Sequence, residues 1–82
     1  MAVFIGAIKS NPTNKDFDKY VKKSVKLIKS NANFQNEKDI AGISQMFAMD
    51  MARDFHGPLG EAYRNGYKKY TAIIIDKVKE KL

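Results

Sequence analysis

Residues 13–30 read TNKDFDKYVKKSVKLIKS, and this stretch decides the fold class of the chain. Its apolar residues recur at steps of three and four, which is the period of an α-helix with one buried face. Thr13 and Asp16 have the spacing of a helix-capping pair, so we predict that a helix begins near Asn14. Ser and Asn residues at 30–33 favour turns and predict its end. The predicted buried face comprises Phe17, Tyr20, Val21, Ser24, Val25 and Ile28.

A second helix is predicted to begin at Asn36, with Asp39 in the first turn where a carboxylate suits the helix dipole. The run His56-Gly57-Pro58-Leu59-Gly60 predicts its end, because glycine suits a left-handed helix cap. Met46 and Met49 widen the apolar surface beyond one stripe, so this helix is either central in the fold or buried against a partner. The residues predicted to point inward are Ile40, Ile43, Phe47, Met51 and Phe55.

Inside this second helix, residues 41–45 (Ala-Gly-Ile-Ser-Gln) are similar to the turn of a helix-turn-helix motif. Lys38 stands where that motif has a small residue, and Asp50 and Asp54 would face the phosphates of the nucleic acid. We therefore favour an uninterrupted amphipathic helix, in which Gly42 is a helix-packing position.

A third helix is predicted from about Pro58 to near Lys81. Gly66 is its weakest position, and its lack of a side chain permits another helix to approach closely there. Residues 73–75 are all isoleucine, which suits a strand, but the surrounding period favours helix. The predicted inner face comprises Leu59, Ala62, Tyr63, Tyr67, Tyr70, Ile74 and Val78.

The sequence thus predicts an all-α fold, a small bundle of three main helices in a single domain spanning residues 1–82. The apolar start of the chain, residues 1–8, leaves room for a short fourth helix at the N-terminus. Cysteine is absent, which excludes disulfides, thiolate metal sites and cysteine nucleophiles and favours the cytoplasm.

Lysines form the most regular polar feature of the chain, and the net charge is +6. They lie on the first helix, opposite its apolar face. They form either a solvated face or a surface that binds an anionic partner; nucleic acid would be contacted through its phosphates, without base readout. The set is Lys15, Lys19, Lys22, Lys26 and Lys29, with Lys23 beside them.

Apolar and aromatic residues of the second and third helices form the other candidate surface. The tyrosines share the inner face of the third helix, which favours packing in the core or in an interface over the stacking of bases. If they stay exposed together with the methionines, they form a protein-binding patch. This candidate partner-binding set is Met46, Met49, Tyr63, Tyr67 and Tyr70.

The sequence gives little support for catalysis or for metal binding. Asp50, Asp54 and His56 lie close together, but two carboxylates and one histidine make no metal-binding motif. One histidine without a nucleophile signature gives no catalytic constellation. We therefore expect neither an enzyme nor a metal or other cofactor.

The chain is short, rich in lysine, asparagine and isoleucine, and free of cysteine, and residues 14–20 (Asn-Lys-Asp-Phe-Asp-Lys-Tyr) are typical of it. In this overall style the protein resembles the small accessory proteins of tailed bacteriophages. The resemblance implies a role in binding and modulating a host or phage protein, in transcription, defence evasion or lysis timing.

Together these features favour a non-catalytic adaptor or inhibitor that binds another protein, with a homo-oligomer as one form of such binding. Two alternatives remain open. The chain is otherwise a nucleic-acid-binding module that uses the lysines of its first helix, or it associates with an anionic membrane or membrane-protein surface.

Overall fold

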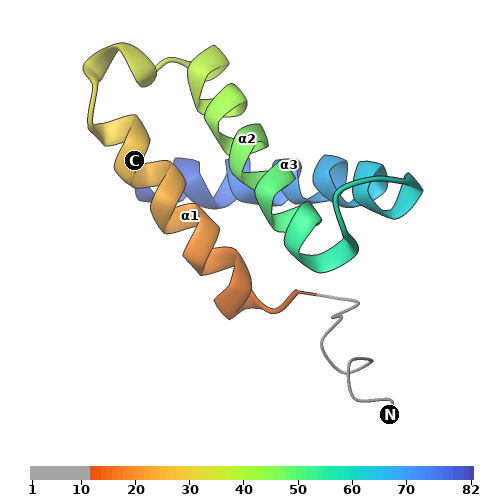
Figure 1. Ribbon diagram of the computed structural model, residues 1–82. Coiled ribbons are helices and arrows are strands. Elements are labelled where there is room, and N and C mark those ends of the chain that lie inside the picture. The colour runs from red at the N-terminus through yellow and green to blue at the C-terminus, as the bar shows by residue number, and fades with distance from the viewer. Residues whose placement is uncertain (1–11) are drawn as a thin grey trace.

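The computed structural model describes residues 12–82, and all of its regular elements are helical. They are α1 (Asn14–Lys29), the single 3₁₀ turn η2 (Ala32–Phe34), α2 (Glu37–His56) and α3 (Glu61–Lys81). The predicted all-α fold of three main helices is confirmed (Figure 1). The predicted short helix at the N-terminus falls outside the described residues.

Helix α1 has the ends that its sequence predicts. The Thr13 hydroxyl accepts a hydrogen bond from the backbone N–H of Asp16, and the Asp16 carboxylate accepts one from the Thr13 N–H at 2.8 Å. This reciprocal capping box satisfies amides that the first helical turn leaves free. Ser30 is the C-cap residue.

Helix α2 also begins where it was predicted, with Asn36 as its N-cap residue. It continues unbroken across Gly42, so the turn of a helix-turn-helix motif does not form. The predicted packing role of Gly42 is wrong, because a Cβ at this position would meet no atom within 4 Å. Gly42 lies on the exposed side of the helix, away from the other helices of residues 12–82.

The connection from α2 to α3 is longer than predicted. Gly57 and Gly60 have φ angles of 88° and 101°, in the left-handed region that helices do not use. Pro58 and Leu59 therefore precede the helix, which begins at Glu61, and Leu59 is 84% exposed instead of packed. Ala62, in the first turn of α3, is also exposed instead of packed.

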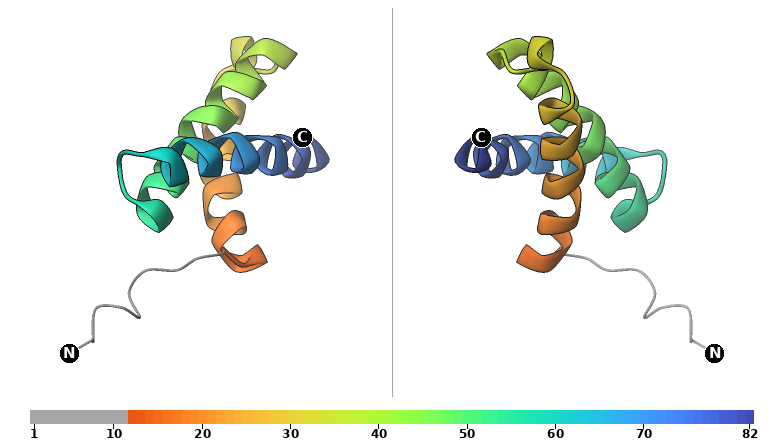
Figure 2. Two further views of the ribbon diagram at one scale, coloured as in Figure 1. Left: turned by 90° about the vertical axis from the view of Figure 1, so that its right-hand side faces the viewer. Right: turned by 90° about the vertical axis from the view of Figure 1, so that its left-hand side faces the viewer.

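The three helices form two layers. Helices α1 and α2 run in opposite directions side by side, and α3 crosses behind them in Figure 1 and in front of α2 in the left view of Figure 2. Phe17 of α1 meets Tyr70 of α3 edge to face, with ring centroids 5.5 Å apart, so the N-terminal half of α1 packs on the middle of α3. The core between the layers consists of Phe17, Tyr20, Val21, Ile28, Ile40, Ala48, Met51, Ala52, Phe55, Tyr70, Ile74 and Val78.

Gly66 confirms the close approach predicted for α3. A Cβ built there would lie 2.7 Å from Cδ2 of His56, so α2 and α3 meet without space for even a methyl group. None of the helices within residues 12–82 is long and apolar enough to cross a membrane.

Candidate functional site

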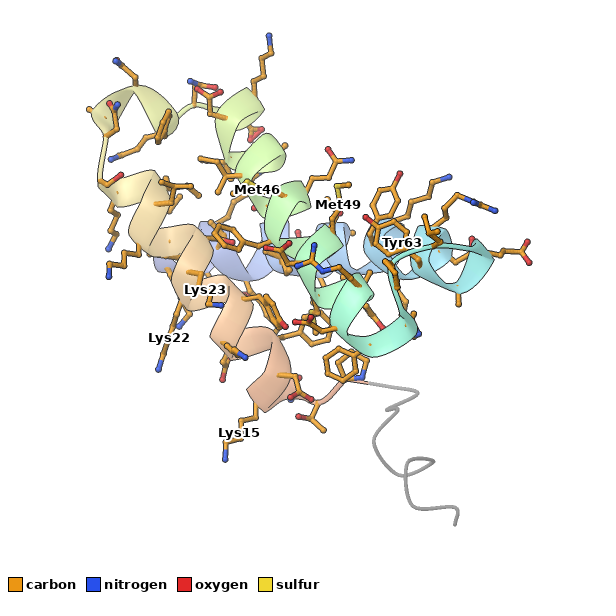
Figure 3. All side chains as sticks on the ribbon, viewed as in Figure 1. Lys15, Lys22, Lys23, Met46, Met49 and Tyr63 are labelled. Atoms are coloured by element: carbon orange, nitrogen blue, oxygen red, sulfur yellow. The ribbon has the colours of Figure 1, made fainter. Side chains whose placement is uncertain are left out.

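The lysines of α1 lie on its solvent side. All six members of the predicted set are exposed, and Figure 3 shows Lys15 and Lys22 projecting away from α2. The two ion pairs within residues 12–82, Arg53–Asp50 and Lys79–Glu37, involve other residues. The lysine face is therefore an exposed cationic surface, as its helical spacing predicts.

Tyr20 connects this face to α2. Its hydroxyl donates a 2.5 Å hydrogen bond to the Asp54 carboxylate, across 34 positions of sequence. Burial raises the pKa of Tyr20 well above its usual value, and the hydrogen bond to Asp54 and the charge of that carboxylate raise it further. The ammonium groups of Lys19 and Lys23 lie 5.6 and 5.5 Å from the centroid of the Tyr20 ring, within the range of a cation–π interaction.

An open, largely apolar groove of about 410 Å³ lies between α1 and α2. The α1 residues of the groove lie on one helix face, because Lys26, Leu27 and Ser30 follow Lys23 by three, four and seven positions. Phe47 is the α2 residue of the groove; it is half-buried and packs against the edge of the core, so the prediction that it points inward holds only in part. The α1-α2 groove, as we call it, is lined by Lys23, Lys26, Leu27, Ser30 and Phe47.

Sequence reasoning missed this groove. The signal that was present is that Leu27 stands next to the core stripe of α1 and shares a helix face with Lys23. The sequence does not give the position of α2 relative to α1, because the separation of two helices depends on every side chain between them.

Met46 and Met49 are 46% and 37% exposed, respectively, and lie one turn apart on α2. Figure 3 shows both methionines on α2 and Tyr63 on α3. Tyr63 and Tyr67 are half-buried, and their ring centroids lie 5.5 Å apart. These four members of the predicted partner-binding set are thus accessible at least in part.

Tyr70 does not belong to that surface. It is only 3% exposed, because it lies between Phe17 and His56 in the core, and the prediction that it contacts a partner is corrected on this ground. Its hydroxyl lies 2.7 Å from Nε2 of His56, and the two rings stack with centroids 5.8 Å apart. Burial raises the pKa of Tyr70, so the neutral phenol is the favoured form.

The acidic residues near His56 are engaged elsewhere. Asp50 pairs with Arg53 at 2.8 Å, and Asp54 accepts the hydrogen bond from Tyr20. In the part of the chain that the structure describes, no group of three histidine, aspartate or glutamate side chains is arranged to hold a metal ion.

A second hollow, of about 270 Å³, lies where the start of α1 meets α3. Lys69 is the one charged residue among its walls, and the others are Pro12, Phe17, Tyr70 and Ile73. Because Phe17 and Tyr70 are core residues, this hollow is the outer edge of the core.

Comparisons with models of protein families, with curated proteins and with solved structures each returned no match to this chain. The roles of its residues are therefore argued from its own geometry.

Proposed function

We propose that this chain is a non-catalytic adaptor or inhibitor that binds and modulates a partner protein. One observation carries the proposal, which is that α2 keeps Met46 and Met49 at the surface while its opposite side fills the core. Methionine side chains are flexible and polarizable, so they adapt to the surface of a partner. Tyr63 and Tyr67 add aromatic rings with polar hydroxyls, the kind of residue that protein interfaces favour.

The phage-like style of residues 14–20 supports a regulatory role of this kind. A small helical protein that has one adaptable surface can modulate a host or phage process, such as transcription, defence or lysis timing, by occupying a surface on a larger protein. A second copy of the chain is one such partner.

The test compares two neighbouring positions on α2. A tagged form of the chain is expressed, purified at low salt and treated with nuclease, and the molar mass of its complexes is measured by light scattering. Met46→Glu should lose a stoichiometric protein partner or a homo-oligomer that the wild type retains. Gln45→Glu adds the same charge at an adjacent exposed position and should retain it. Equal retention by both variants, or a monomer without any partner, contradicts the proposal.

Nucleic-acid binding is the second candidate, and the exposure of all six lysines of the α1 face favours it. Ammonium groups contact phosphates without reading sequence, so such binding falls steeply with salt. Duplex DNA would then be bound at about 50 mM salt and lost at about 200 mM, and Lys19→Glu with Lys22→Glu and Lys26→Glu would abolish it. Binding that withstands salt, or that survives these substitutions, contradicts this candidate.

Membrane association through α1 has less support. The apolar side of α1 would have to enter the lipid, but Phe17 is only 7% exposed and Val21 and Ile28 are fully buried. These side chains already form the core, so inserting them would require α1 to leave the fold.

A further inference from the structure

We infer that the α1-α2 groove docks an acidic amphipathic helical segment of a partner protein. This inference rests on the proposed adaptor function and adds to it a second place of contact, separate from Met46 and Met49, and the chemistry of the partner there. The groove differs from the surface around Met46 and Met49 because it combines apolar residues with lysines.

The floor of the groove is formed by Leu27 and Phe47, which are half-buried residues from two different helices. Covering such a surface with an apolar side chain of a partner releases the water on it, which favours binding. A volume of about 410 Å³ lies within the range of sites that hold small organic groups, so it accepts a few side chains of a partner. An open groove between two helices is also the shape in which an amphipathic helix lays its apolar face.

The charge at the border of the groove specifies the partner's polar residues. Lys23 and Lys26 are exposed, lie one helical turn apart, and take no part in the ion pairs of residues 12–82. Lys23 is held near the Tyr20 ring, so part of its freedom is already restricted before a partner arrives. Carboxylates of a partner helix placed beside its apolar anchors would meet these two ammonium groups.

The same features favour a protein segment over the other anionic partners. Phosphates need only the cations, and nucleic acid would leave the apolar floor uncovered. A bilayer is entered by side chains that project, whereas Leu27 and Phe47 lie half-buried between their helices.

The test selects peptides from a displayed library of 16-residue helical sequences on the immobilised full chain. Enriched peptides should be acidic, with large apolar residues three and four positions apart. Lys23→Glu with Lys26→Glu should weaken the best peptide at least tenfold. Lys15→Glu with Lys22→Glu makes the same charge change on α1 outside the groove and should weaken it by less than threefold.

A second measurement places the peptide. The chain contains no tryptophan, so Phe47→Trp introduces one indole in the groove, which can be excited without exciting the four tyrosines. Its emission should shift to shorter wavelength when the peptide binds, because the indole becomes less exposed to water. Vesicles of phosphatidylcholine and phosphatidylglycerol and a duplex DNA are tested in parallel and should leave the emission unchanged.

Each outcome decides the inference. A tenfold loss confined to the groove variant, together with the shift in emission, supports it. If the enriched peptides bind both charge variants equally, the groove is not their binding site, although the adaptor function is not contradicted. If the tryptophan emission shifts with vesicles or DNA but not with peptides, the partner is a membrane or a nucleic acid and the inference is wrong. If no peptide is enriched, the inference is wrong, and the Met46→Glu comparison then decides separately whether the adaptor function fails too.

Discussion

At the scale of single residues, two serines in the helix interfaces have unequal surroundings. Ser24 and Ser44 are both fully buried. The Ser24 hydroxyl donates to the backbone carbonyl of Tyr20 at 3.0 Å, whereas the Ser44 hydroxyl has no hydrogen-bond partner among residues 12–82. A buried hydroxyl without a partner has lost its hydrogen bonds to water and gained none in return.

We therefore predict that Ser44→Ala raises the free energy of unfolding by about 1 kcal/mol. Ser24→Ala serves as the control, because it removes a hydroxyl that is satisfied, and it should lower the free energy by up to about 1 kcal/mol. Urea unfolding followed by circular dichroism measures both. A lower urea midpoint for Ser44→Ala than for the wild type would contradict the prediction.

Two glycines inside helices should respond in opposite ways to the same substitution. Gly42→Ala places a methyl group in open space and should raise the free energy of unfolding by about 0.5–1 kcal/mol, since alanine favours helix. Gly66→Ala drives a methyl group to within 2.7 Å of the His56 ring, which is held by Tyr70 through stacking and a hydrogen bond. It should lower the free energy by about 1–3 kcal/mol. Thermal unfolding of the pair checks the signs. A Gly66→Ala variant at least as stable as the wild type would refute the assignment of Gly66 to the interface, and a destabilised Gly42→Ala variant would refute the prediction for Gly42.

At the scale of elements, the hydrogen bond between Tyr20 and Asp54 joins α1 to the C-terminal part of α2. The pKa of Tyr20 is raised in the folded chain, by burial first and by Asp54 second, so the unfolded chain releases this proton at lower pH. The stability that neutral Tyr20 contributes is therefore complete below the ordinary tyrosine pKa of 10.0 and is lost as the pH rises above it.

Tyr20→Phe should accordingly lower the free energy of unfolding by about 1 kcal/mol at pH 7. Between pH 9 and pH 11 it should also lose less stability than the wild type. Urea midpoints at the two pH values measure this, and the comparison cancels the lysines, which titrate in both proteins. Parallel losses in both proteins would show that Tyr20 titrates alike in the folded and unfolded chains.

The ends of the helices show what sequence can predict of an element and where this stops. Thr13 with Asp16, and likewise Asn36, mark helix starts because a capping side chain bonds to an amide two or three residues away. The start of α3 was placed too early because proline suits a first helical turn, whereas the φ angles of Gly57 and Gly60 depend on how α3 packs after the turn.

In the candidate surfaces, too, the sequence predicts the exposure of some residues and not of others. Exposure of the lysines follows from their spacing on one helix. The sequence left open whether Met46 and Met49 lie in the core or at the surface, and the structure places both at the surface. Tyr70 and Tyr67 are three positions apart on the same predicted face, yet only Tyr70 is buried, because Phe17 and His56 cover it from two other elements. The groove depends likewise on Phe47, whose side chain lies between two helices that the sequence does not orient.

At the scale of the whole molecule, the net charge of +6 acts against folding, because like charges repel more strongly in the compact state. We predict that raising the salt from about 0.02 to 0.3 M increases the urea midpoint, since the Debye length shortens to a few ångströms. Lys15→Glu with Lys22→Glu brings the net charge from +6 to +2 and should reduce this response. A midpoint that falls with salt would show that the exposed pairs Arg53–Asp50 and Lys79–Glu37 outweigh the repulsion.

The exposed turn between α2 and α3 offers a practical handle. Leu59 is 84% exposed, and the sequence contains no cysteine, so Leu59→Cys would carry the one thiol of the chain. A dye or spin label attached there would sit outside the core, on a turn whose shape is defined by Gly57 and Gly60. Paired with a second label on a partner, it would report the distance between them while the lysine face, the methionines and the α1-α2 groove remain unmodified.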